Sequence, residues 1–121
     1  MQPLLAPKLT DFLKRFDSFR GSEVISFQIV SPTVIELLMR VQDAHRDFDW
    51  IELTLQFNGI SDARLIENEK MSLIDMSDGV TLKNDGSKFA FGIGAGYNVA
   101  NISDSICYIL ANSIKYKESM F

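Results

Sequence analysis

The alternation of apolar and polar side chains between Trp50 and Phe57 constrains the fold of this chain more than any other feature of its sequence. Every second residue is large and apolar, and this apolar set consists of Ile51, Leu53, Leu55 and Phe57. A period of two residues places such a set on one face of a β-strand. A one-residue slip would turn the whole set toward solvent, so the pattern also fixes the register of the strand. The turn dipeptide Asn58-Gly59 ends it.

Similar strand patterns occur before and after this segment. Residues 24–30 and 33–42 alternate in the same way and are rich in β-branched side chains, with Pro32 at the turn between them; for residues 33–42 a helix is the alternative. A short strand is expected at residues 63–66. The closing segment, residues 103–117, fits either a helix or a strand, and its β-branched and aromatic residues favour the strand.

Two further turn dipeptides organise the region after the middle of the chain. Asp78-Gly79 and Asp85-Gly86 enclose residues 80–82, which predicts that these residues pair with residues 89–93 in a hairpin. Residues 71–76, just before the first dipeptide, are expected to form either one helical turn or irregular structure.

A single helix is predicted at the beginning of the chain, over residues 7–19. Its apolar residues recur at intervals of three and four and are Leu9, Phe12, Leu13, Phe16 and Phe19. Pro7 suits the first helical turn, and Gly21 suits the position just after the last turn. The helix therefore presents one apolar stripe for packing on a sheet.

One helix followed by strands with short turns predicts an α+β fold of one domain, residues 1–121. In this fold the N-terminal helix packs on one face of a mostly antiparallel, meander-like sheet of six or seven strands. The composition supports a compact core, because 46% of the residues are hydrophobic and nine are Phe. Cys107 is the only cysteine, which excludes a disulfide within the chain. No secretion signal or membrane span is recognised, so a cytoplasmic protein without membrane association is expected.

Acidic residues are concentrated in the middle of the chain. Ten of the sixteen Asp and Glu residues fall between Asp43 and Asp85 with only four Lys or Arg, giving this stretch a formal net charge of −6 against −4 for the whole chain. Such a surface repels nucleic acid and attracts basic partners. Loops can present charge without disturbing a sheet, so the candidate partner-binding residues in the least regular region are Asp62, Glu67, Glu69, Asp75 and Asp78. The alternative is a solvated rim that maintains solubility.

Trp50 is a further candidate for partner binding, because tryptophan is enriched at the energetic centres of interfaces. It opens the segment with the clearest alternation, so the competing interpretation is that its ring covers one edge of the core.

Other candidate sites lack part of their pattern. Gly92, Gly94 and Gly96 resemble a dinucleotide-binding loop, but position 97 is Tyr and no convincing helix follows, so the expected role is a glycine-rich strand end. The acids and the histidine of residues 43–49 have metal-ligand chemistry, yet a solvated connection is favoured. Cys107 lies in an apolar run and is expected to be buried and inert. We therefore expect no catalytic residues, no cofactor and no metal.

Three segments of the sequence resemble a known group of proteins. They are residues 50–65 (WIELTLQFNGISDARL), residues 78–80 (DGV) and residues 107–116 (CYILANSIKY). Together they resemble small bacterial immunity proteins, encoded beside polymorphic or contact-dependent inhibition toxins, and their uncharacterised relatives. From the first segment to the last, the resemblance spans residues 50–116, about half of the chain. It implies a non-enzymatic protein that binds and neutralises a cognate toxin, with no catalytic residues to transfer.

The resemblance and the charge distribution agree on one hypothesis. Nuclease toxins are commonly basic because they bind phosphate, and an acidic loop face attracts such a surface. The leading hypothesis is therefore a non-catalytic immunity-type protein that binds a basic toxin through this face, with no nucleic acid as partner. The alternative is an assembly module, such as a homodimer, whose exposed strand edges pair with a partner strand.

Overall fold

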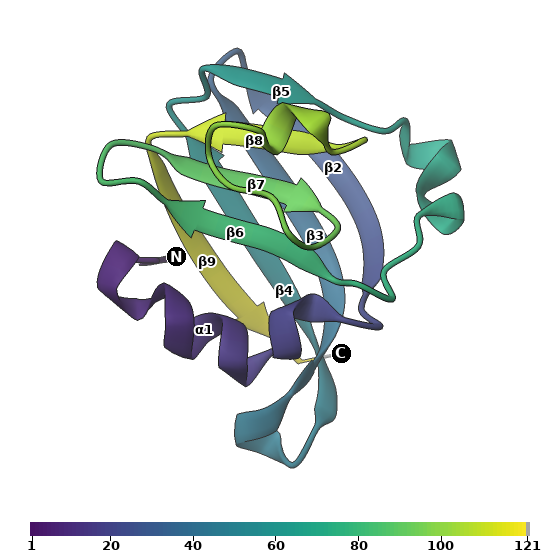
Figure 1. Cartoon of the computed structure of the whole chain (residues 1–121). Helices are drawn as coiled ribbons and strands as arrows, with labels where there is room; N and C mark the ends of the chain where they lie inside the picture. The colour runs from purple at the N-terminus through teal and green to yellow at the C-terminus, as the bar shows by residue number, and fades with distance from the viewer. Residues whose placement is uncertain (121) are drawn as a thin grey trace.

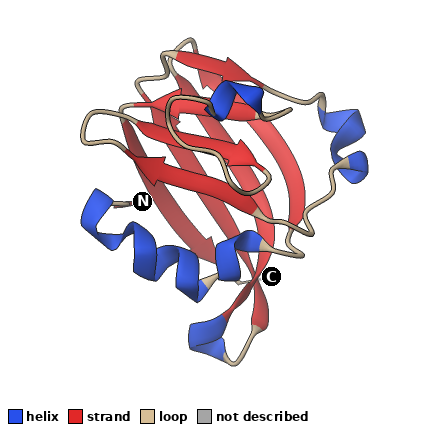
Figure 2. Ribbon diagram, in the orientation of Figure 1, coloured by secondary structure: helices blue, strands red, loops and turns tan. Residues whose placement is uncertain are grey.

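The computed structural model describes residues 1–120 and folds them into two antiparallel sheets that face each other, with a short helix at one end (Figure 1). The predicted α+β class, the antiparallel pairing and the N-terminal helix are confirmed. Figure 2 shows how strands dominate the molecule, while its helical segments are short and lie at the periphery. The nine strands of residues 1–120 divide between two sheets, instead of forming one sheet of six or seven strands.

The five-stranded sheet contains the segments that alternate most clearly in the sequence. Its spatial order is β1 (Gln2–Pro3), β9 (Ser113–Ser119), β4 (Asp49–Asn58), β3 (Val34–Asp43) and β2 (Glu23–Ser31). The predicted strands at 24–30, 33–42 and 50–57 are thereby confirmed. The closing segment also forms strands, so the helical alternative for it is wrong.

The four-stranded sheet is built from shorter strands. Its order is β5 (Asp62–Arg64), β8 (Tyr108–Ala111), β7 (Phe89–Ile93) and β6 (Val80–Asn84). The predicted hairpin is present as β6 and β7, which pair from Val80 with Ile93 to Asn84 with Phe89. The segment expected to be irregular or one helical turn, residues 71–76, begins within a 3₁₀ helix, η4 (Asn68–Leu73). Residues 74–79 then lead into β6.

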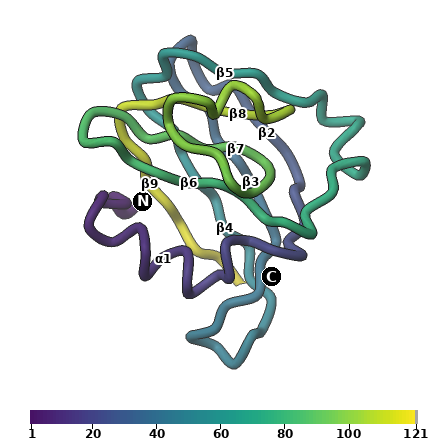
Figure 3. Tube along the Cα trace, in the orientation of Figure 1, coloured from purple at the N-terminus to yellow at the C-terminus, as the bar shows by residue number. Residues whose placement is uncertain are grey.

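The chain crosses between the two sheets at two points, which can be followed in Figure 3, and the two crossings contact each other. Asn112 alone separates β8 of one sheet from β9 of the other, and its backbone N–H donates to Asn58 O at 3.0 Å. Gly59 begins the opposite crossing, from β4 to β5. A Cβ at Gly59 would lie 2.6 Å from Asn112 Nδ2, so only glycine leaves room for both crossings.

The N-terminal helix is shorter than predicted. Its regular part, α1 (Leu9–Arg15), follows a 3₁₀ turn, η1 (Ala6–Lys8), and precedes a second such segment, η2 (Asp17–Phe19). Asp17, Ser18 and Phe19 all have φ between 51° and 61°, so the helix ends before Gly21. Non-glycine residues rarely adopt this left-handed conformation. Phe19 is fully buried and stacks on Phe16, and this packing holds the turn in place.

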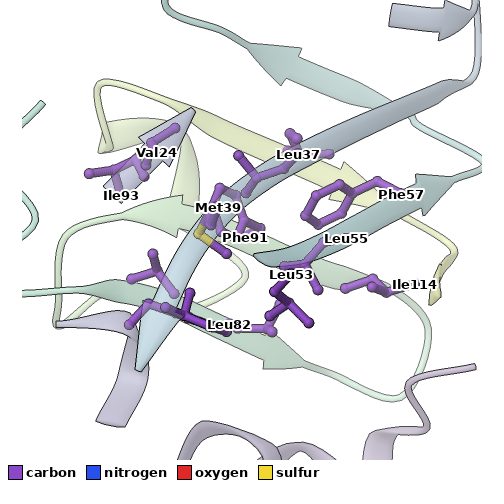
Figure 4. Close-up of a cluster of buried hydrophobic side chains, with 14 of the residues drawn as sticks. Val24, Leu37, Met39, Leu53, Leu55, Phe57, Leu82, Phe91, Ile93 and Ile114 are labelled. Atoms are coloured by element: carbon purple, nitrogen blue, oxygen red, sulfur yellow. The ribbon is translucent and has the colours of Figure 1, made fainter. Parts of the chain in front are cut away.

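The core lies between the two sheets and is closed at one end by α1. Figure 4 shows its centre, where side chains from both sheets meet. The alternating residues of β3 and β4 point inward, and the rings of Phe57 and Phe91 join the two sheets at 5.3 Å. Phe12 of α1 contacts Tyr116 of β9 at 5.1 Å between ring centroids. The predicted apolar stripe of the helix is therefore confirmed as part of this core.

The outer faces of the two sheets differ. A loop carrying a 3₁₀ turn, η5 (Ile102–Asp104), covers the outer face of β7, and a Cβ at Gly92 would lie 2.6 Å from Ile102 Cδ1. On the five-stranded sheet the outward residues are polar for the most part, as the cross-strand neighbours Arg40 and Glu52 illustrate. Alternation along β3 and β4 thus reflects one face buried in the core and one face turned away from it.

Candidate protein-interaction surface

A groove of about 570 Å³ lies between the beginning of β2 and the segment that contains η4. One wall comes from β2 and the residues before it, and the other from η4 and the residues after it. Its lining residues are Gly21, Ser22, Glu23, Val24, Ile25, Trp50, Asn68, Glu69, Met71, Ser72, Ile74 and Met76. Apolar side chains and carboxylates thus share one concave surface.

Hydrogen bonds fix the two walls of the groove to each other. The side-chain amide of Asn68 accepts from the N–H of Phe27 at 3.0 Å and donates to the carbonyl of the same residue at 3.2 Å. Asn68 therefore occupies the open edge of β2 as a neighbouring strand residue would. The N–H of Gly21 also donates to Met76 O at 2.9 Å. Met71 and Met76 are buried as well. The groove is therefore preformed by the fold and is not made by a loose loop.

The charge along the groove has one sign. Glu23 and Glu69 line it, and none of its lining residues is lysine or arginine. Glu23 has Arg40 as a distant partner, with 4.0 Å between Oε1 and Nη1. Trp50 lines the same groove and leaves 42% of its surface exposed. The structure therefore brings together two of the residues predicted to bind a partner, Trp50 and Glu69.

The other acids of the predicted face follow the same segment of chain, with one exception. Glu67, Asp75 and Asp78 are exposed on residues 67–78, and Glu67 forms an ion pair with Lys70 at 3.7 Å. The N–H of Ser77 donates to Asp75 and lowers the pKa of this carboxyl. Asp62 instead belongs to β5, where it accepts a hydrogen bond from the Tyr108 hydroxyl at 2.9 Å. This bond raises the pKa of Tyr108.

A buried ion-pair network lies at the base of the β3–β4 hairpin. Asp43 is fully buried, and Arg15 of α1 donates to both of its oxygens at 2.8 and 2.7 Å. Arg15 also binds Glu118 of β9, while Arg46 approaches Asp43 at 3.3 Å. The Arg15 hydrogen bonds hold the pKa of Asp43 below its usual value. Arg15 of the helix thus joins Asp43 of the hairpin to Glu118 of the last strand.

Beyond this base, the β3–β4 hairpin projects from the molecule, as the lower part of Figure 1 shows. A 3₁₀ turn, η3 (Ala44–Arg46), leads to Asp47 and Phe48, whose φ angles are 54° and 64°. The N–H of Phe48 donates to Asp43 O at 2.9 Å, yet 62% of the Phe48 surface is exposed. Phe48 was not predicted as a candidate, although a bulky apolar residue between Asp47 and Asp49 in a polar turn is itself a signal of an exposed position.

At the remaining candidate sites, the groups that could bind a ligand are buried or bonded to other parts of the protein. Asp43 is held by Arg15 and is therefore committed to the hairpin base, and within residues 1–120 no group of three or more His, Cys, Asp or Glu residues is arranged to hold a metal ion. In the glycine-rich segment, the N–H of Ile93 donates to Cys107 O at 3.0 Å and the N–H of Gly94 donates to Gly79 O at 2.9 Å. These two amides are therefore not available to bind a phosphate. Cys107 is buried, as predicted, and burial raises the pKa of its thiol to about 11.

Comparison of the chain with protein-family models, with curated proteins and with solved structures gave no match. Within residues 1–120, no helix combines the length and the apolar character that a membrane span requires. The groove and the acidic residues 67–78 are therefore the features that point to a function.

Proposed function

We propose that this protein is a non-catalytic, immunity-type protein that binds a basic, nuclease-like toxin through the groove and the exposed acids of residues 67–78. The observation that carries the proposal is the convergence of Trp50 and Glu69 on one groove that no lysine or arginine lines. A half-exposed tryptophan in a concave, negatively charged surface suits binding to a basic protein.

Electrostatics supports this choice of partner. Glu67, Glu69, Asp75 and Asp78 lie within twelve consecutive residues beside only one base, Lys70. Clustered charge of one sign accelerates the approach of an oppositely charged protein, and salt screens this effect over roughly 8–10 Å at ordinary ionic strength. Binding is therefore expected to weaken as salt concentration rises, with the association rate changing more than the dissociation rate.

The experiment uses the product of the adjacent gene, because immunity proteins are encoded beside their toxins. Its inactivated form is titrated with the wild type and with a triple variant, Glu69→Lys, Asp75→Lys and Asp78→Lys. We expect the triple variant to bind at least about tenfold more weakly at low salt, since three attractive contacts become repulsive.

A matched control variant separates the position of the charges from their number. Asp11→Lys, Asp17→Lys and Asp104→Lys change the net charge equally at exposed sites away from the groove lining. The control variant is expected to bind within about twofold of the wild type, because the acidic residues at the groove are unchanged. Equal binding by the wild type and the triple variant at low salt would show that the acidic face is not the binding surface. Failure of the wild type to bind the neighbouring product would contradict a toxin partner.

A second candidate function is self-assembly through the edge of β2. Beyond Phe27, where Asn68 no longer covers the edge, Ile29 and Val30 are 70% and 53% exposed. An open edge with β-branched side chains can pair with the same edge of a second copy. Light scattering across a concentration series tests this candidate: a stable dimer that becomes monomeric in the Val30→Lys variant supports it, and a monomer at all concentrations contradicts it.

A further inference from the structure

We infer that the groove between β2 and η4 receives an arginine side chain of the partner. This inference rests on the proposed function, because it specifies which group of a basic protein enters the groove. It follows from the polar groups, the apolar walls and the rigidity of this one site.

The polar groups of the groove suit a cation. Glu23 and Glu69 contribute carboxylates, and within residues 1–120 the ion pairs do not include Glu69. The pair between Glu23 and Arg40 is long, at 4.0 Å. A cation that enters the groove therefore meets one carboxylate without an ion pair and a second that is only weakly paired. The amide of Asn68 is already bonded to Phe27.

The apolar part of the groove distinguishes arginine from a small inorganic cation. Its walls include Trp50 and the side chains of Val24, Ile25, Met71, Ile74 and Met76. A guanidinium group is planar and weakly hydrated and stacks on aromatic rings, while its three-carbon stem packs on apolar surface. A metal ion would gain little from these walls, and a lysine ammonium, which is compact and strongly hydrated, would stack less well on the Trp50 ring than a planar guanidinium. Arginine therefore uses both the carboxylates and the hydrophobic lining.

The rigidity of the site reduces the entropic cost of binding. Asn68 holds η4 against β2, and the Gly21 to Met76 hydrogen bond closes the opposite end. Met71 and Met76 are anchored in the core. A preformed groove binds with less ordering than a loop that must close around its ligand.

Trp50 provides the measurement, because it is the only tryptophan in the chain. The full-length protein is titrated with N-acetyl-arginine amide while Trp50 fluorescence is followed at low salt. N-acetyl-citrulline amide is the control, since it has nearly the same shape but no charge. We expect a saturable change with the arginine compound and an apparent affinity at least about fivefold lower for the citrulline compound.

A double variant, Glu23→Gln with Glu69→Gln, tests the role of the two carboxylates. Both positions are exposed, so we expect the variant to fold, and circular dichroism checks this. Its affinity for the arginine compound is expected to fall at least about fivefold. The inference is overturned if citrulline binds as well as arginine, if the double variant binds arginine normally, or if fluorescence shows no saturable change. These results leave the proposed function standing, because the wild-type protein can bind the neighbouring gene product without an arginine pocket. The proposed function is overturned only by the binding assay with that product.

Discussion

At the scale of single residues, backbone geometry and one buried carboxylate explain much of the structure. Gly21 and Gly79 both have φ of +69°, but their surroundings differ. A Cβ at Gly79 would lie 2.1 Å from the carbonyl oxygen of Ser18, whereas a Cβ at Gly21 would meet nothing within 4 Å. Gly79 is therefore required for space as well as for conformation. The left-handed turn at residues 17–19 can dock on the β-sandwich only because Gly79 has no side chain.

This difference yields a matched pair of substitutions. Gly21→Ala is expected to lower the free energy of unfolding by about 1 kcal/mol, because alanine is strained at positive φ. Gly79→Ala adds a steric clash with the backbone and is expected to lower it by roughly 3 kcal/mol. Urea denaturation of both variants measures the difference. Equal effects at the two positions would contradict the close approach of Ser18 to Gly79.

The lowered pKa of Asp43 makes the free energy of unfolding depend on pH. Its pKa is lower in the folded protein than in the unfolded chain, so folding favours the carboxylate. The resulting stabilisation is complete above about pH 4, the ordinary pKa of Asp, and is lost as the pH falls through the lowered folded-state pKa. Asp43→Asn is expected to lower the free energy of unfolding by about 3 kcal/mol at neutral pH, because Arg15 loses its charged partner.

Urea denaturation between neutral and acidic pH checks this prediction. The stability of Asp43→Asn is expected to change less than that of the wild type as the pH falls below about 4. Glu67→Gln is the control, since its ion pair with Lys70 is exposed and should contribute less than about 1 kcal/mol. Parallel pH profiles for the wild type and Asp43→Asn would show that Asp43 does not couple the hairpin to α1.

At the scale of elements, local patterns predicted the strands well and the helix only in part. Strand β4 was predicted because one of its faces is buried from Ile51 to Phe57, which imposes strict alternation on the sequence. The helix was extended too far because Phe16 and Phe19 keep a helical spacing even though residues 17–19 are left-handed. Burial of Phe19 overrides the local preference there, and no periodicity reports such a tertiary effect.

The β3–β4 hairpin carries a prediction about strain. Phe48 has φ of 64° and is exposed, so its ring contributes little burial in return for an unfavourable backbone conformation. Phe48→Asn is expected to raise the free energy of unfolding by about 1 kcal/mol, since asparagine tolerates this conformation better. Ile106→Asn is the control, because Ile106 is similarly exposed at 63% but is not among the positive-φ residues. Thermal unfolding of both variants distinguishes relief of strain from removal of an exposed apolar side chain.

At the scale of the whole molecule, the division into two sheets and the assembly of the groove were beyond local sequence patterns. Strand β9 follows β8 after one residue but pairs with β4 in the other sheet, which a meander prediction does not anticipate. Trp50 and Glu69 were each proposed for partner binding, yet only the tertiary fold brings them to the same groove. Asp62 was grouped with them on charge alone and instead bonds to Tyr108. Charge composition therefore predicted the character of the surface, whereas its shape depends on contacts between distant segments.

We propose that a basic protein partner binds at the groove and the adjoining acidic segment. A nuclear magnetic resonance titration of the isotope-labelled protein with the inactivated product of the adjacent gene tests this proposal residue by residue. We expect the largest shifts on the Trp50 indole, on Glu23 and on residues 67–78, and we expect added salt to reduce them. Shifts confined to the loop around η5 would place the partner on the other sheet, and no shifts at all would mean that this product is not a partner; either result overturns the proposal.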